Sequence, residues 1–239
     1  VGNEQDYHFK VLFLILKKLG YTWADNCFHL SYGMVDLPSG KMKSREGTVV
    51  DADDLIDEVT LTAKEMTQER GHLEGLNDEE RNQLYSQIGL GGLKYYLLKV
   101  DPKKRMLFDP AESIDLTGNT GPFIQYAHAR IATLLQKAEY KSMALSTDLE
   151  LKPEEQEIIK HLAQFPNIVE EAAKQYSPAV VANYIYELVK LYNTFYQSVK
   201  IIIEPDAQLK QMRLSLSALV QQTIAHGLNM LGIEAPQRM

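Results

Sequence analysis

Three cationic side chains lie within five residues of one another, between two glycines, in a chain whose formal net charge is −7. They are Lys41, Lys43 and Arg45, and the segment that holds them runs from Gly40 to Gly47. Glycine permits backbone angles that other residues avoid, and lysine and arginine are suited to binding phosphate groups. The spacing therefore indicates a loop that closes over a phosphorylated ligand. A solvated basic turn is the alternative.

The elements before this loop are typical of the end of a parallel α/β sheet. Apolar residues at helical spacing predict a helix from Gln5 to Leu19 that ends at Gly20, and residues 27–32 form a short β-prone run. We expect the residues before the helix to end another strand. Ligands of open parallel sheets gather at the carboxyl ends of the strands, which is where this order of elements places the cationic loop.

After the loop the pattern is helical, with Asp51 and Asp53 at the start of the first helix and Asp78 as the cap of the second. The predicted helices cover residues 52–70, 78–100, 122–138, 152–165 and 167–175, followed by one that opens at Pro178 and one from 207 to 230. Pro166 is expected to interrupt the fourth of these, and residues 103–120 are expected to be irregular. Gly89, Gly91 and Gly92 indicate close approach of another helix or of a ligand.

Composition narrows the class of protein further. Hydrophobic residues make up 45% of the chain and charged residues 24%, as in ordinary globular proteins. The longest apolar run, residues 11–16, is far below the roughly 20 residues of a membrane span. The lone Cys27 excludes an internal disulfide and favours a cytoplasmic location, and neither cysteines nor histidines have the spacing of a structural metal site. The first residues carry acids where a secretory signal carries positive charge, and the missing initiator Met indicates a fragment.

Several polar side chains fall near the predicted strand ends, where they suit a nucleoside triphosphate. Glu4, Gln5 and His8 offer partners for ribose hydroxyls, and Met34 and Val35 offer backbone groups for an adenine edge. A histidine near a core is more often structural, and that alternative stays open for His8 and His29. In the helical half, most tyrosines at helical spacing are expected to belong to a core, and the remainder suit stacking on unpaired bases. The candidates are Tyr126, Tyr184, Tyr186, Tyr192 and Tyr196, together with Arg130.

Three segments resemble arginyl-tRNA synthetases, which are class I aminoacyl-tRNA synthetases. Gly-Lys-Met-Lys-Ser-Arg-Glu-Gly-Thr-Val-Val at residues 40–50 is similar to their signature loop. Gly-Asn-Thr-Gly-Pro-Phe-Ile-Gln-Tyr-Ala-His-Ala-Arg at residues 118–130 is similar to their Gly-Asn-Thr-Gly-Pro-Tyr-x-Gln-Tyr-Ala-x-x-Arg segment, and residues 5–9 match Gln-x-x-His-Phe. The ending, from residue 231 to Met239, resembles their helical anticodon-binding domain.

The resemblance implies a mainly α fold, in which the C-terminal remnant of a class I Rossmann-like α/β catalytic domain is followed by an all-helical anticodon-binding bundle. The expected boundaries are residues 1–60 for the catalytic remnant with the signature loop, 61–120 for a helical connection and 121–239 for the bundle. The substrates implied for the whole enzyme are arginine, tRNA for arginine and ATP with Mg²⁺, with no structural metal and no membrane, and we expect a monomer.

Site roles follow from the same resemblance. Glu4, Gln5 and His8 are expected at the ribose and adenylate, and Met34 and Val35 beside adenine. Lys41, Lys43 and Arg45 are expected on the loop that closes over phosphates. Tyr126 and Arg130 are expected where tRNA reaches the catalytic domain, and Met239 near the anticodon loop.

Two departures from the class I pattern limit what the chain can do alone. Ser44 occupies the position of the second lysine in Lys-Met-Ser-Lys-Ser, and Lys43 or Arg45 are its possible substitutes. No His-x-Gly-His motif is present, so the resemblance implies that the chain alone forms no arginyl-adenylate, because half of the charge-stabilising donors are missing. A stand-alone helical RNA-binding module and a protein-interaction module are the alternatives.

Overall fold

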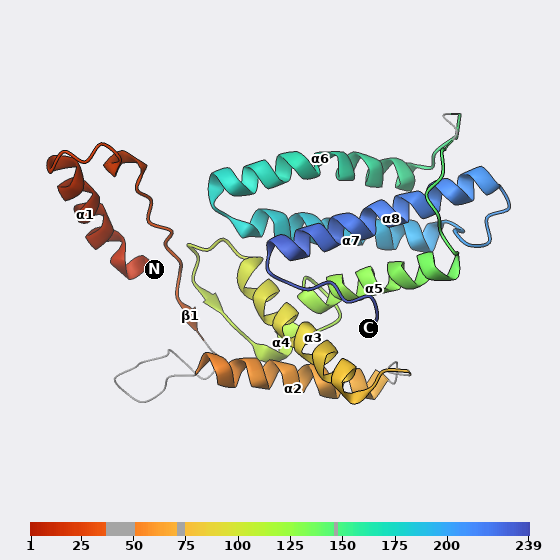
Figure 1. Cartoon of the computed structure of the whole chain (residues 1–239), viewed down its shortest axis with the longest axis horizontal. Helices are drawn as coiled ribbons and strands as arrows, with labels where there is room; N and C mark the ends of the chain where they lie inside the picture. The colour runs from red at the N-terminus through yellow and green to blue at the C-terminus, as the bar shows by residue number, and fades with distance from the viewer. Residues whose placement is uncertain (37–50, 71–74, 146–147) are drawn as a thin grey trace.

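The computed structural model describes residues 1–36, 51–70, 75–145 and 148–239. Its first unit combines a short 3-10 helix (η1, Asn3–Gln5), α1 (Asp6–Lys18) and a second 3-10 helix (η2, Ala24–Asn26). Gly20 follows α1 with a φ of +86°, as predicted for a helix that ends in a glycine. No residue of α1 is buried, so its apolar stripe does not reach a core within the described chain. Figure 1 shows this unit set apart from the remaining helices.

The strand prediction for residues 27–32 was wrong. Only an isolated parallel bridge between Gly2 and Tyr32 forms there. A ladder needs a neighbouring strand of similar length, and the described chain offers residues 27–32 only the first few residues as a partner. Within the described residues, the sheet instead pairs β1 (Val35–Asp36) with β2 (Met106–Leu107) in parallel.

The segment expected to be irregular, residues 103–120, holds β2 and a short helix, α4 (Pro110–Ile114). Asp109 caps α4, because its Oδ1 accepts hydrogen bonds from the backbone N–H groups of Ala111 (2.9 Å) and Glu112 (3.3 Å). The sequence signal for this helix was present as Asp-Pro, a cap followed by proline in the first turn.

Helices α2 (Ala52–Arg70) and α3 (Asp78–Leu98) pack closely against each other. A Cβ atom added to Gly89 would lie 2.9 Å from backbone atoms of Thr60 and Val59, so a glycine is needed at this crossing. The predicted close helix contact is thereby confirmed. The cap of α3 is Asn77 and not Asp78: its side chain and that of Glu80 form a reciprocal capping box.

The second half forms a bundle of four long helices, α5 (Gly121–Lys137), α6 (Pro153–Gln175), α7 (Pro178–Ser198) and α8 (Ala207–Met230). Figure 1 shows α6, α7 and α8 running side by side above α5. The predicted interruption at Pro166 was wrong, because α6 continues through it. Proline removes one backbone donor from a helix, and the packing of α6 on α7 outweighs that loss.

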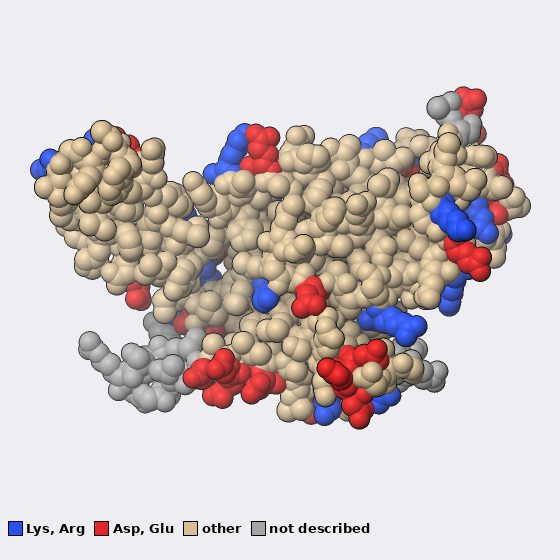
Figure 2. Space-filling model, in the orientation of Figure 1, with Lys and Arg blue, Asp and Glu red and all other residues tan. Residues whose placement is uncertain are grey.

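Two hydrophobic clusters hold the described chain together. The larger cluster joins the four helices α5, α6, α7 and α8 and includes Tyr95 of α3. The smaller cluster joins α2, α3 and α4 around Val59, Ile88 and Phe108. Acidic side chains gather over α2 and the start of α3, at the lower edge of the view in Figure 2. Among the helices that the structure describes, none is long and apolar enough to cross a membrane.

Candidate functional site

The cationic loop itself, with Lys41, Lys43 and Arg45, lies outside the described residues, so its role stays a prediction. Asp36, the last described residue before the loop, belongs to the β1–β2 pair. Arg105 donates from Nη2 to Oδ1 of Asp36 at 2.8 Å, and the backbone N–H of Phe108 donates to the Asp36 carbonyl at 2.8 Å.

The predicted ribose and adenine residues flank one parallel bridge. Asn3 donates its backbone N–H to the Tyr32 carbonyl at 2.8 Å, next to the Gly2–Tyr32 bridge. Glu4, Gln5 and His8 follow the first of these segments, and Met34 and Val35 follow the second, so both groups leave the bridge at the same edge. Glu4, Gln5, His8 and Met34 are exposed, whereas Val35 is half-buried. The arrangement suits a ligand at that edge.

His29 has structural partners that its sequence did not reveal. Its ring stacks on Phe9 with centroids 4.1 Å apart, and its Nδ1 lies 3.0 Å from Oδ1 of Asp6. It therefore joins the segment after η2 to α1.

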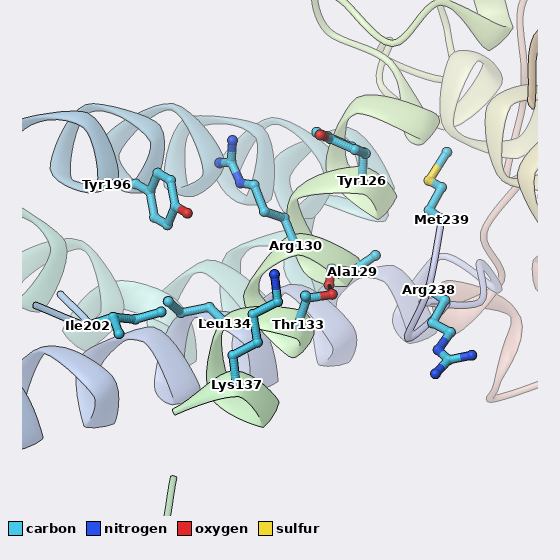
Figure 3. A pocket seen from close by; sticks show the side chains of 10 residues that line it. All are labelled: Tyr126, Ala129, Arg130, Thr133, Leu134, Lys137, Tyr196, Ile202, Arg238 and Met239. Atoms are coloured by element: carbon cyan, nitrogen blue, oxygen red, sulfur yellow. Dashed lines mark hydrogen bonds between the residues drawn. The ribbon is translucent and has the colours of Figure 1, made fainter. Parts of the chain in front are cut away.

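A groove of about 580 Å³ brings together the three residues that the resemblance assigns to tRNA. Tyr126 and Arg130 come from α5, and Met239 comes from the end of the chain, more than a hundred positions later. The sequence placed these residues at two different contacts with tRNA, and the structure shows that they line one groove (Figure 3). Its other lining residues are Ala129, Thr133, Leu134, Lys137, Tyr196, Ile202 and Arg238.

Arg130 is held between two tyrosine rings in this groove (Figure 3). Its guanidinium carbon lies 4.8 Å from the ring centroid of Tyr196 and 5.9 Å from that of Tyr126, and its Nη2 donates to Oδ1 of Asn193. Such cation–π contacts are worth roughly 0.5–2 kcal/mol each. Tyr126 is 40% exposed and Tyr196 is 38% exposed, so both rings keep free surface beside a fixed cation.

Of the other candidate tyrosines, Tyr184 and Tyr192 belong to the core, whereas Tyr186 is half-buried and packs against it. Tyr184 and Tyr192 are 5% and 0% exposed, and burial raises the pKa of each hydroxyl to about 12. The Tyr192 hydroxyl hydrogen-bonds to the Ser217 hydroxyl at 3.1 Å. They have no surface to offer a ligand.

Lys137 and Arg238 were not singled out from the sequence. Lys137 could have been found from helical spacing, since it lies seven residues, or about two turns, after Arg130 on the same side of α5. Arg238 carried no such signal, because it enters the groove only through the path of residues 231–239.

Comparison with known proteins extends the resemblance over nearly all of the chain. Residues 1–109 match the family model described as the catalytic domain of class I tRNA synthetases (R), and residues 124–239 match the DALR anticodon binding domain. The boundaries drawn at residues 60 and 120 stay a prediction beside these matches.

Two curated relatives are arginine–tRNA ligases. The chain is 57% identical over 239 residues to the arginine–tRNA ligase of Flavobacterium psychrophilum, and 49% identical over 243 aligned residues to that of Porphyromonas gingivalis. These alignments cover the whole of this chain and 40% and 41% of the two relatives. The structure of Thermus thermophilus arginyl-tRNA synthetase superposes with a TM-score of 0.86 at 30% identity, covering 97% of this chain and 39% of that one. The chain therefore belongs to the arginyl-tRNA synthetase family, and it spans about 40% of the length of the curated relatives it matches.

Proposed function

We propose that the chain supplies the tRNA-binding bundle and one wall of the ATP site in an enzyme that attaches arginine to tRNA. The observation that carries the proposal is the groove in which Tyr126, Arg130 and Met239 meet. In a chain with a net charge of −7, this groove gathers three cations, Arg130, Lys137 and Arg238.

The chemistry of the groove suits an unpaired stretch of RNA. Lysine and arginine bind phosphate, and exposed aromatic rings stack on bases that are not paired, at about 1–3 kcal/mol per base. Tyr126 and Tyr196 expose ring surface on either side of the Arg130 guanidinium, which is already oriented by Asn193. The groove therefore offers stacking surfaces beside one cation, Arg130, that needs little reordering before RNA binds.

Binding of a tRNA with an arginine anticodon, measured at two salt concentrations, tests this proposal. Affinity should fall steeply as salt rises, and Tyr196→Ala should weaken binding by about 5- to 150-fold, the equivalent of one lost stack. Lys137→Met should weaken binding and reduce the salt slope by about one unit. Lys160→Met is the matched control, because Lys160 is an exposed lysine on α6, paired with Glu157 at 2.7 Å.

Two results would contradict the proposal. The first is binding that ignores salt and does not prefer arginine anticodons, as expected of a protein-interaction module. The second is an equal loss of affinity in the Lys137 and Lys160 variants, since that would mean that the groove has no special role.

The same proposal covers the ATP side. Glu4, Gln5 and His8 would hold the ribose and adenylate, Met34 and Val35 would flank adenine, and Lys41, Lys43 and Arg45 would bind the phosphates of ATP with its Mg²⁺. What supports this is the common edge from which the two groups of described residues leave the Gly2–Tyr32 bridge.

The chain alone is expected to form no arginyl-adenylate, because its sequence lacks the His-x-Gly-His donors. Arginine-dependent exchange of pyrophosphate into ATP by the chain, with or without tRNA, would refute this part. The proposal also keeps the monomeric state and the cytoplasmic location that were expected from the sequence.

A further inference from the structure

The last nine residues leave α8 and run across α3 and α5 to the groove. We call residues 231–239 the C-terminal tail. Gly232 turns the chain with a φ of +67°, and its backbone N–H donates to the Asn229 carbonyl at 2.9 Å. Pro236 is buried, and Arg238 and Met239 reach the groove beside Tyr126 and Arg130. The groove therefore depends on where the tail lies.

Side chains from two helices contact alternate carbonyl groups of the tail. Lys94 of α3 donates from Nζ to the Gly232 carbonyl at 2.6 Å. Gln125 of α5 donates from Nε2 to the Glu234 carbonyl at 2.8 Å. His128 of α5 places Nδ1 2.9 Å from the Pro236 carbonyl, and because that oxygen can only accept, Nδ1 carries the proton.

Two of the three donating side chains are themselves buried, so their partners matter. Gln125 is 0% exposed and His128 is 2% exposed. Gln125 also donates to the Gln87 carbonyl of α3 at 3.0 Å, and Gly91 leaves room for it, because a Cβ there would lie 2.5 Å from the Gln125 amide. A buried polar side chain is stable only where its partner is in place, so these side chains fix one path for the tail.

We propose that His128 and Gln125 are positioning residues for RNA binding: they anchor the tail so that Arg238 and Met239 complete the groove. His128 lies two residues before Arg130 on α5, which is about half a helical turn. It therefore lies on the opposite, buried side and acts on the groove through the tail carbonyl of Pro236. This inference rests on the proposed RNA-binding function of the groove, and it adds residues that contact no RNA.

His128→Leu and His128→Asn separate anchoring from general stability. Leucine removes the hydrogen bond while still filling the buried space with an apolar side chain, whereas the asparagine amide can replace the Nδ1 donor. The matched control is His161→Leu, because His161 also contacts a backbone carbonyl, with Nε2 3.2 Å from that of Tyr184, at a place in the bundle that does not touch the tail.

Anchoring is read from the Met239 methyl signal in the 239-residue chain labelled at its eight methionine methyl groups, with Met239→Leu for assignment. In His128→Leu, that signal should sharpen and move toward the position of a free chain, and tRNA affinity should fall by about tenfold, as for one lost charge-assisted contact. His128→Asn should restore both readings, and His161→Leu should change neither.

Because His128 acts through the tail, most of its effect on tRNA binding should be lost once Arg238 is removed. His128→Leu in an Arg238→Ala background should therefore weaken tRNA binding much less than in the unaltered chain. An unchanged Met239 signal in His128→Leu overturns the anchoring, and a freed tail with unchanged affinity overturns its role in RNA binding. An unaltered chain that binds no tRNA overturns the proposed function and with it the RNA part of this inference, while the Met239 signal still decides the anchoring.

Discussion

A buried charge network in the bundle gives the sharpest stability prediction. Arg213 on α8 is 2% exposed, and its Nε donates to Oε1 of Glu155 on α6 at 2.7 Å. Its Nη1 donates to the Lys200 carbonyl at 2.7 Å and also binds Glu204. We consider Arg213→Met, which keeps most of the side-chain volume and removes the charge with all three contacts.

The magnitude follows from what the substitution leaves behind. Glu155 is 0% exposed, and without Arg213 its carboxylate would keep, among the residues that the structure describes, one hydrogen bond, from the Lys152 backbone N–H at 2.7 Å. Removing one partner of a buried ion pair costs about 3–5 kcal/mol, because the other charge stays uncompensated. Since total stability is typically about 5–15 kcal/mol, this is a large fraction of it.

Urea unfolding followed by circular dichroism measures the effect, with the difference in unfolding free energy as the readout. Arg213→Met should lose about 3–5 kcal/mol. Adding Glu155→Gln should recover at least about 1 kcal/mol, since glutamine is neutral and can still accept from the Lys152 N–H. Lys160→Met, which breaks an exposed pair, should lose less than about 1 kcal/mol.

A loss of less than about 1 kcal/mol in Arg213→Met, or a double variant no more stable than the single one, would contradict a buried, uncompensated Glu155. Either outcome would mean that water or a shifted side chain compensates Glu155. Arg213 also contacts the connection between α7 and α8, through the Lys200 carbonyl and Glu204. Ile202 of this connection lines the groove, so the same variant tests whether Arg213 holds the connection in place.

Three further predictions concern other parts of the fold. Burial lowers the pKa of His128 below its usual 6.5, so the unfolded chain binds the proton more readily than the folded one. The contribution of neutral His128 to the free energy of unfolding should therefore be complete above about pH 6.5 and fall as the pH drops below it. Urea titrations at several pH values should show a smaller pH dependence for His128→Asn. Gly89→Ala should destabilise the chain by about 1–3 kcal/mol despite a helix-propensity gain of about 1 kcal/mol, because its Cβ would lie 2.9 Å from the Thr60 backbone, and a stability increase would show that α2 can move aside. Trp23, the only tryptophan, lies in the unit whose helix α1 has no buried residue, so its fluorescence should change at lower urea than circular dichroism does, whereas coincident curves would show one cooperative unit.

Helix starts were the part of the fold that could be predicted best, because their signals are local. Pro178, Asp206 and the Gly-Pro pair at residues 121–122 each lie at a helix start in the structure. Asp206 shows why: its Oδ1 accepts from the backbone N–H groups of Gln208 and Leu209, at 2.8 and 3.0 Å, and needs no distant residue to do so.

Strands and helix breaks were predicted less well, since both depend on neighbours. The run at residues 27–32 has β propensity, yet a strand forms only where another edge is available. Pro166 weakens a helix by a fixed local amount, but α6 packs along α7, and the cluster around Ile158 and Tyr184 stabilises the continuous helix by more.

From spacing alone the groove could be predicted only through its α5 residues, because its other wall depends on the tail. Met239 was assigned to tRNA by the resemblance, at a different contact. Tyr126, Arg130 and Lys137 share one side of a helix, a pattern that is visible in the sequence. Arg238 joins them because Gln125 and His128, spaced for a buried side of the same helix, bind carbonyls of the tail. A carbonyl acceptor is the same in every residue type, so no sequence pattern marks it.

The boundary between the two family matches does not divide the packing. Tyr95 of α3 lies within the residues that match the catalytic domain, yet its hydroxyl donates to the Ala182 carbonyl of α7 at 2.9 Å and its ring lies in the core of the bundle. In the other direction, Met239 lies within the anticodon-binding match and packs against the cluster that α2 and α3 share. Because Tyr95 lies in the core of the bundle and Met239 packs against the smaller cluster, the groove on α5 and the β1–β2 edge are joined by one continuous set of contacts through α3.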